Sequence, residues 1–368
     1  MALIRFDGVA HSYSGHARQD SDYALQPMNF RWEDGGAYAL LGPSGCGKST
    51  LLNICSGLLA PSEGRVYFDD QDVTAMSPEK RNIAQVFQFP VLYDSMSVYD
   101  NLAFPLRNRR VARPQIDKRV REVAAMLDLE DVLKRRASGL GAELKQKISM
   151  GRGLVRDDTS AILFDEPLTV IDPQLKWRLR RQLKEVHKQF SHTLIYVTHD
   201  QIEALTFAEK VVVMSDGEMV QVGTPQALFE RPEHTFVGYF IGSPGMNFLP
   251  CSIANGAAVV GSTHIPLTDA QAGAAAKHGS GNDQFKLGIR PEFVTRAAGD
   301  NGLKVSVTHV ADMGEFRLVT AKLEGHEIKI KLPVEAGEVD TGEMAVEFPS
   351  RWVCLYRNER LIGDEVTS

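Results

Sequence analysis

A glycine-rich segment near the N-terminus has the residue types and spacing that bind phosphate. It fits the pattern G-x-x-x-x-G-K-[ST] and consists of Gly42, Pro43, Ser44, Gly45, Cys46, Gly47, Lys48, Ser49 and Thr50. In this pattern the glycines turn backbone N–H groups toward phosphate oxygens, the lysine reaches the β- and γ-phosphates, and the first hydroxyl binds Mg²⁺. A helix that begins near Lys48 would add its positive end. A chance glycine-rich turn is the alternative, but the strand and helix patterns on either side favour a site for ATP and Mg²⁺.

Two adjacent acids follow an apolar run at residues 161–164. Asp165 is placed to hold Mg²⁺, directly or through water. Glu166 is placed to orient and polarise an attacking water as a general base. Strands often end in solvated acids, so the pair is informative only together with the phosphate-binding segment upstream. The combination predicts hydrolysis of ATP.

The elements that must position these residues alternate between strand-like and helical patterns over the first 240 residues. Apolar runs at 37–41, 161–164 and 193–197 each end in polar residues, which is typical of ligand sites in open α/β sheets. Residues 114–155 are rich in helix-forming and charged residues. We therefore expect an α/β domain over residues 1–240, with a P-loop ATPase core, a mainly parallel sheet and a helical subdomain inserted at about 90–158.

The remainder, residues 241–368, has a different character. Gly242 to Gly245 has the composition of a linker, and runs at 304–307 and 327–331 alternate polar and apolar residues with period two. This predicts an all-β domain, an OB-like small barrel. The glycine- and alanine-rich segment from Ala272 to Gly281 predicts a flexible loop.

Composition narrows the class of protein. The net charge is 41 − 47 = −6, which argues against a nucleic-acid partner. No run approaches the 18 apolar residues of a membrane span, and the N-terminus has no pattern of a signal peptide. The four cysteines have neither paired nor metal-binding spacing, which favours reduced thiols. A role at a membrane would need another chain to hold this one there.

Taken together, these residues resemble the ATP-binding cassette (ABC) family over the whole chain. The resemblance implies that Gln88 belongs to a glutamine loop that touches Mg²⁺ and water, and that His199 contacts the γ-phosphate. It further implies that Asp172 communicates across a dimer of ATPases and that Tyr13 stacks on adenine. Each has a plainer alternative: a polar loop residue for Gln88, a structural side chain for His199, and a half-buried strand aromatic for Tyr13.

Residues 198–225, 236–249 and 287–292 resemble the sugar- and polyol-import branch of this family. That branch implies two integral membrane permease subunits, a second ATPase subunit, an extracytoplasmic solute-binding protein, and a location at the cytoplasmic face of the bacterial inner membrane. It also implies that the β domain is regulatory and helps to hold two subunits together. Within it, Arg290 and Glu292 are expected to form a structural ion pair. Residues 164–172 resemble ATPase subunits of glycerol importers, which use two different ATPase chains.

One motif departs from the family. The signature Leu-Ser-Gly-Gly-Gln corresponds here to Leu140-Gly141-Ala142-Glu143-Leu144, so the serine is lost and an acid replaces the second glycine. In the family this segment caps the γ-phosphate bound to the opposite subunit. We therefore expect a heterodimer of ATPases with one strong and one weak site. Two alternatives stay open: a regulatory subunit that binds ATP but scarcely hydrolyses it, and an ABC protein outside transport, such as a translation or repair factor.

Overall fold

The computed structural model describes residues 2–14, 19–169, 171–190, 192–277, 284–298 and 302–363. Internal contacts divide the chain into two units, Met1–Pro225 and Gln226–Ser368. The boundary therefore falls before the one expected after Phe240. Helices α7 (Pro225–Glu230) and α8 (Thr235–Phe240) lie at this boundary, and α8 belongs wholly to the second unit. Among the helices in the described ranges, none has both the length and the apolar character needed to cross a membrane.

A six-stranded sheet forms the centre of the first unit, in the order β10-β9-β3-β8-β7-β6. All neighbours are parallel except β10, which pairs antiparallel with β9. The strands predicted at 37–41, 161–164 and 193–197 are confirmed, and almost all of their side chains are buried. The six strands of this sheet are β3 (Ala37–Leu41), β6 (Ile83–Val86), β7 (Ala161–Asp165), β8 (Leu194–Thr198), β9 (Lys210–Ser215) and β10 (Glu218–Gly223).

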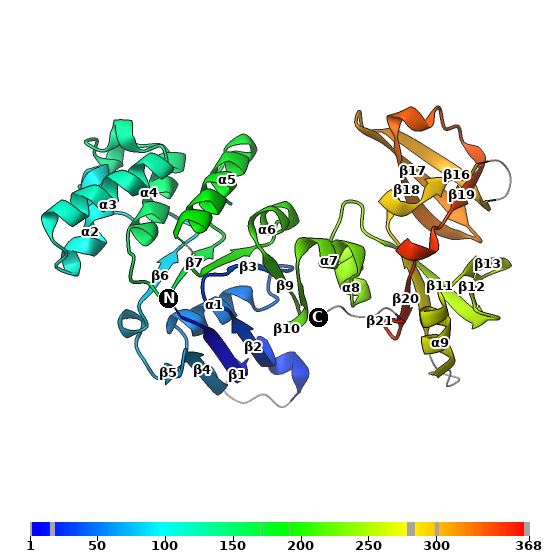
Figure 1. Cartoon of the computed structure of the whole chain (residues 1–368), viewed down its shortest axis with the longest axis horizontal. Coiled ribbons are helices and arrows are strands. Elements are labelled where there is room, and N and C mark those ends of the chain that lie inside the picture. Colours follow the sequence, from blue (N-terminus) through cyan, green and yellow to red (C-terminus); the bar gives the residue numbers. More distant parts are fainter. Residues whose placement is uncertain are drawn as a thin grey trace. The chain divides into compact units, whose positions relative to one another are not determined.

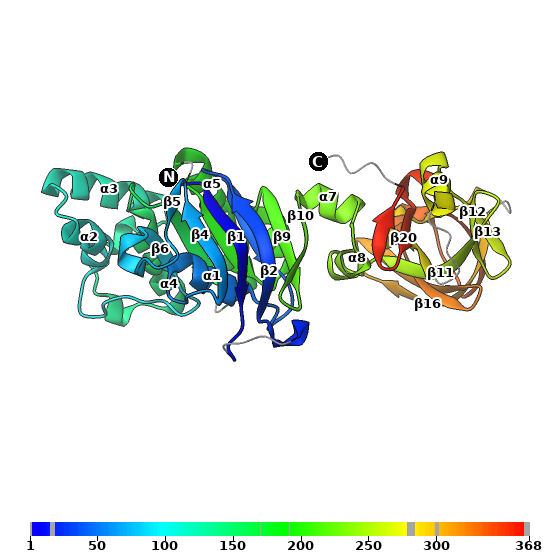
Figure 2. The same cartoon turned by 90° about the horizontal axis from the view of Figure 1, so that it is seen from below.

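A second, antiparallel sheet of the first unit was not expected. It has the order β2-β1-β4-β5 and consists of β1 (Ile4–His11), β2 (Leu25–Trp32), β4 (Glu63–Phe68) and β5 (Gln71–Asp72). Figure 2 shows β1, β2 and β4 side by side. Phe6 and Trp32 meet edge to face at 5.0 Å and share one apolar core with Leu51 and Leu52 of helix α1 (Lys48–Ser56). This sheet therefore fixes the helix that follows the phosphate-binding segment.

Helices gather into a subdomain at one end of the first unit (Figure 1). They are α2 (Val98–Asn108), α3 (Arg113–Met126) and α4 (Ala142–Leu154). The hydroxyl of Ser97 caps α2 by accepting from the Asp100 amide at 3.0 Å. A Cβ atom at Gly151 would lie 2.5 Å from the end of the Leu102 side chain, so the glycine leaves room for α2 to pack closely on α4. Two further helices, α5 (Pro173–Phe190) and α6 (Gln201–Phe207), follow strands β7 and β8.

The second unit is built from two antiparallel sheets that share one apolar core, which confirms the all-β prediction. One has the order β13-β12-β11-β14-β20-β21 and the other β15-β19-β16-β17-β18. Their strands are β11 (Asn247–Ala254), β12 (Ala257–Val260), β13 (Thr263–Pro266), β14 (Phe285–Ile289), β15 (Thr295–Arg296), β16 (Leu303–Asp312), β17 (Phe316–Leu323), β18 (His326–Pro333), β19 (Gly342–Glu347), β20 (Cys354–Arg357) and β21 (Arg360–Ile362).

The flexible loop predicted from Ala272 is wrong in its first part, where helix α9 (Asp269–Lys277) lies instead. Alanine is the strongest helix former, and the segment contains several. Gln271 anchors the helix because its buried amide donates to the carbonyl of Val353 at 2.8 Å. Residues 278–281 of the predicted loop lie outside the described residues.

The expected ion pair between Arg290 and Glu292 is also wrong, because Glu292 instead lies 3.5 Å from the Lys331 ammonium. Arg290 is fully buried and donates to the carbonyls of residues in α7 and around the end of α8: Leu228, Phe229, Gly238 and Ile241. A guanidinium has five donors, which suits several carbonyls at once. Burial lowers the pKa of Arg290 to about 10, so the group keeps its charge at neutral pH.

Candidate nucleotide site

The strand register brings the predicted site residues to one edge of the central sheet. Val86 pairs with Phe164, Asp165 with Val197, and Leu41 with Thr198, all in parallel ladders. The carboxyl ends of these four strands therefore lie together. The segment from Gly42, the acids Asp165 and Glu166, the loop with Gln88, and His199 all follow these ends, as expected for a ligand site in such a sheet.

The phosphate-binding segment forms an open turn between β3 and α1. Gly45 and Gly47 have φ angles of +85° and +98°, a region that favours glycine. A Cβ atom at Gly47 would lie 2.5 Å from the carbonyl of Ala24, whereas at Gly45 it would meet nothing within 4 Å. Ser44 and Gly45 are exposed, and no side chain caps the start of α1. Free N–H groups on an open turn and at a helix N-terminus fit a bound phosphate.

Lys48 is held across this turn. Its side chain is buried, and its ammonium donates to the carbonyls of Gly42 and Pro43 at 2.8 Å each. Within the described ranges it makes no ion pair with a carboxylate, so its charge is free to meet phosphate. The Cys46 sulfur lies 3.7 Å from the same ammonium. Burial raises the pKa of the Cys46 thiol, which keeps it protonated and neutral at pH 7.

Ser49 and Asp165 provide the oxygen atoms that a magnesium ion prefers. The Ser49 hydroxyl donates to the Asp165 carboxylate at 3.4 Å. Burial, and next the charge of Glu166, raise the pKa of Asp165. A divalent cation at this point would offset both effects, so the donor set fits Mg²⁺. Gln88 is half-buried just beyond β6, and its amide makes no hydrogen bond to any described residue, which leaves its oxygen free as a further ligand.

Glu166 and His199 are brought into contact. The imidazole Nδ1 lies 3.1 Å from one carboxylate oxygen, and the Thr169 hydroxyl donates to the other at 3.2 Å. The backbone of Glu166 has a φ of +46°, an uncommon conformation for a residue with a side chain, and its amide donates to Val197 at 3.0 Å. Such strain is found at functional sites. Thr169 was not singled out from the sequence, although its position three residues after Glu166 is a usable signal.

Tyr13 and Asp172 lie on the surface. The Tyr13 side chain is 69% exposed, yet its hydroxyl lies 3.2 Å from that of Thr50, beside the phosphate-binding segment. Its ring meets His11 edge to face at 4.7 Å. The Asp172 carboxylate accepts from the Gln174 amide at 3.0 Å and thereby caps α5. In this chain Asp172 has a local structural role, and its role across a dimer stays a prediction.

The degenerate signature lies at the start of α4, where Gly141 precedes the helix without a side-chain cap. The Glu143 carboxylate lies 3.5 Å from the ammonium of Lys147, one turn along the helix. Lys147 is buried and also lies 3.6 Å from Asp128, which in turn accepts from Arg178 of α5 at 2.7 Å. Glu143, which replaces a glycine of the signature, therefore points toward the Lys147 ammonium. Lys147 also links α4 to α5, because Asp128 lies close to both Lys147 and Arg178.

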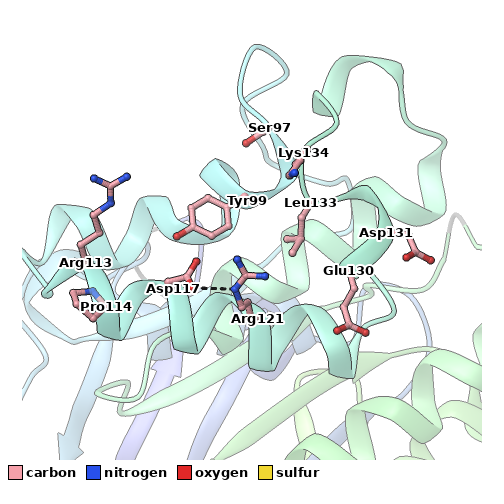
Figure 3. A pocket seen from close by; sticks show the side chains of 10 residues that line it. All are labelled: Ser97, Tyr99, Arg113, Pro114, Asp117, Arg121, Glu130, Asp131, Leu133 and Lys134. Carbon is pink, nitrogen blue, oxygen red and sulfur yellow. Dashed lines mark hydrogen bonds and ion pairs between the residues drawn. The ribbon is translucent and has the colours of Figure 1, made fainter.

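A cavity of about 890 Å³ lies on the helical subdomain, away from these residues (Figure 3). It is lined by Ser97, Tyr99, Arg113, Pro114, Asp117, Arg121, Glu130, Asp131, Leu133 and Lys134. Arg121 and Asp117 form an ion pair at 2.9 Å across its floor. Basic and acidic side chains balance one another in this cavity, so it does not suit a polyanion such as ATP.

Comparison with known proteins agrees with this geometry. A family pattern described as ABC transporter matches residues 25–169, a MalK OB fold domain matches 242–294, and a TOBE domain matches 287–351. A solved structure, cbiO1 of Clostridium perfringens, described as part of the ABC transporter complex cbiONQ, is similar with a TM-score of 0.57 and 27% identity. That likeness covers 62% of this chain and 91% of the other.

Relatives that match most of the chain are named import ATP-binding proteins. The trehalose/maltose import ATP-binding protein MalK of Thermococcus litoralis is 39% identical over 82% of this chain and 85% of its own length. The oligosaccharides import ATP-binding protein MsmX of Bacillus subtilis is 35% identical over 95% of both chains. The sn-glycerol-3-phosphate import ATP-binding protein UgpC of Escherichia coli is 39% identical over 82% of both. The chain therefore belongs to the ABC transporter family, as the ATPase subunit of a sugar or polyol importer.

Proposed function

We propose that this chain hydrolyses ATP as one half of an asymmetric pair of ATPases that drives uptake of a carbohydrate or polyol, with glycerol the first solute to test. One contrast carries the proposal. The side that the chain uses for its own nucleotide has all of its expected residues, with the Lys48 ammonium held by backbone carbonyls and Glu166 in contact with His199. The segment it would offer to a partner's nucleotide carries Glu143 where the family has glycine.

Each residue of the site then has a role in hydrolysis. The open turn and Lys48 hold the β- and γ-phosphates, while Tyr13 stacks on the base. Ser49, Asp165 and Gln88 would hold Mg²⁺, which supplies neutralisation of phosphate charge. Glu166 orients the attacking water and accepts its proton, and His199 holds the γ-phosphate in place. Most of the catalysis is positioning and charge stabilisation.

The asymmetry follows from electrostatics. A signature segment must meet the γ-phosphate of the opposite subunit with N–H groups, and a carboxylate there opposes a polyanion. A second ATPase with an intact signature would complete the site of this chain, whereas this chain would complete the partner's site less well. Two copies of this chain would weaken both sites. The second ATPase is therefore proposed to be a related chain.

Exposed apolar side chains support docking of permease subunits. Phe89, Val91 and Tyr93 follow the glutamine loop directly and are 69%, 57% and 41% exposed. Grouped apolar side chains on a surface mark interaction sites. We propose that two integral membrane permease subunits dock here, at the cytoplasmic face of the bacterial inner membrane, and receive solute from an extracytoplasmic solute-binding protein. The transported solute would not contact this chain.

The test is the composition of the complex extracted from its own membrane. Native mass measurement is expected to find one copy of this chain, one related ATPase and two permease subunits. Two copies of this chain in a fully active complex would contradict the asymmetric pair. Uptake of labelled glycerol and of several sugars by proteoliposomes containing the complex, with its binding protein, then identifies the solute.

Glu143 and Leu144 favour a second candidate, a chain that binds ATP for regulation and hydrolyses little of it. The two candidates differ at Glu166. If the chain hydrolyses ATP, Glu166→Gln in this chain should reduce turnover of the assembled complex by at least about a hundredfold, the scale of general base catalysis. If it is regulatory, the same substitution should leave turnover nearly unchanged.

A further inference from the structure

Glu203 is a buried carboxylate with three partners from two other elements. It lies in α6 and is 2% exposed. One carboxylate oxygen accepts from the hydroxyls of Thr198 at 2.9 Å and Tyr196 at 3.0 Å, both in β8. The other oxygen lies 3.2 Å from the ammonium of Lys176 in α5. The side chain therefore bridges β8 and α5.

On the β8 side, Glu203 fixes the turn that carries His199. Thr198 immediately precedes His199, and its hydroxyl donates to Glu203 while accepting from the Asp200 amide at 3.0 Å. The Thr198 hydroxyl is therefore oriented by one hydrogen bond that it donates and one that it accepts. Burial, and next the charge of Glu203, raise the pKa of Tyr196, so its phenol stays protonated and remains a donor.

On the α5 side, the ion pair reaches the segment that holds Asp172. The Lys176 amide donates to the Asp172 carbonyl at 2.9 Å, so Lys176 stands in the first turn of the helix that Asp172 caps. The Lys176 side chain is 21% exposed and its charged end approaches Glu203. The two residues expected to contact nucleotide and partner, His199 and Asp172, are therefore joined by a short chain of contacts.

A buried ion pair of this kind is not required for stability. Replacing such pairs with apolar residues is often neutral or stabilising, because desolvation offsets much of the Coulomb attraction. An apolar contact between α5 and α6 would serve packing equally well. A carboxylate that accepts hydrogen bonds from two hydroxyls and forms an ion pair with one ammonium, by contrast, brings three groups to one point.

We propose that Glu203 is a positioning residue for ATP hydrolysis, which through Thr198 orients the His199 turn and through Lys176 ties that turn to the Asp172 segment. The proposal rests on the proposed roles of His199 and Asp172 and extends them. Glu203 touches neither nucleotide nor water, so its effect should fall on the rate of the chemical step more than on the binding of ATP.

The test is a double-mutant cycle in the assembled transporter. Glu203→Gln keeps an acceptor for the hydroxyls but removes the charge, and Lys176→Met removes the cation. Each is expected to lower kcat about tenfold with less than about a twofold change in KM for ATP, and the double variant should be no worse than either alone. Arg181→Met is the matched control, because Arg181 forms an exposed ion pair with Glu185 at 3.1 Å on the same helix.

Four results would overturn the proposal. A fall in thermal stability with kcat unchanged, or kcat losses that simply add in the double variant, would show that the pair is only structural. A complex carrying Glu166→Gln, measured alongside, reports on the proposed function itself. If the Glu166→Gln complex loses turnover while the Glu203 and Lys176 variants keep an unchanged kcat, only the positioning role is rejected. If the Glu166→Gln complex retains its turnover, both hydrolysis by this chain and the positioning role of Glu203 are rejected.

Discussion

Replacement of Lys147 by an uncharged residue should leave the Glu143 carboxylate of the signature segment without its positively charged partner. An unpaired carboxylate about 4 Å from a phosphate charge would cost about 4 kcal/mol at an effective dielectric constant of about 20. Lys147 lies 3.5 Å from Glu143, and attraction at that distance has about the same size and opposite sign. The Glu143 side chain is 33% exposed, so water screens both effects. We expect Lys147→Met to weaken ATP-driven closure by about 1–2 kcal/mol, or about tenfold.

The assay is steady-state turnover of the assembled transporter as a function of ATP concentration. Lys147→Met should raise the ATP concentration at half-maximal turnover about tenfold, and Glu143→Gln in the same chain should restore most of the loss. Lys145→Met is a suitable control, because Lys145 lies on the same helix but pairs with Asp94 at 3.1 Å, away from Glu143. Its half-maximal ATP concentration should match that of the unaltered complex.

Equal impairment of turnover by Lys147→Met with and without Glu143→Gln would contradict an effect through Glu143. In that case Lys147 would act through Asp128, which it approaches at 3.6 Å, and the charge on the signature segment would not matter. A gain of activity on Lys147→Met alone would contradict the sign of the effect.

Three further predictions concern the chain itself. Gly47→Ala should abolish ATP binding, measured by equilibrium dialysis, because φ is +98° and the new Cβ would lie 2.5 Å from the Ala24 carbonyl; binding within twofold of normal would contradict this. Arg81→Met should lower the free energy of unfolding in urea by about 3 kcal/mol, because the buried guanidinium donates to carbonyls at the end of α1 that would lose their partner. Burial lowers the pKa of His192 to about 4, so its unfolded form binds a proton more readily. Stability is therefore full above pH 6.5 and falls by about 3 kcal/mol as pH drops toward 4, a loss that His192→Gln should remove.

The grouping of the candidate site residues was predictable from the sequence because the motifs that carry them are local. The phosphate-binding segment is a single contiguous motif, and the central strands that end at Asp165 and Thr198 are continuous apolar runs. Parallel strands place such ends at one edge of a sheet, so the proximity of the residues after β7 and β8 followed from the fold class. The pairing of Glu143 with Lys147 also has a local signal, since i and i+4 positions of a helix face the same side.

Other features could not be predicted from the sequence, for physical reasons. The antiparallel sheet at the N-terminus was missed because β1 has register shifts between Phe6 and Val9 and between Val9 and His11, which break the period-two pattern. The partners of Glu203 lie in two other elements, and no spacing rule relates Lys176 to it. The composition changes at Gly242, where the MalK OB fold pattern also begins, whereas the internal contacts divide the chain earlier, between Pro225 and Gln226, and no sequence pattern indicates that division.

The hydrogen bonds of Arg290 show where the chain can be divided. A gene fragment ending at Phe240 would keep α7 and α8 but remove the guanidinium that meets their carbonyls. A fragment beginning at Ile241 would leave that buried guanidinium with the Ile241 carbonyl alone among these acceptors. A chimera that exchanges the β domain between importers should therefore be joined between Pro225 and Gln226. A joint there transfers α8 and all of α7 except Pro225 together with the β domain, so that Arg290 keeps its carbonyl acceptors in the new chain.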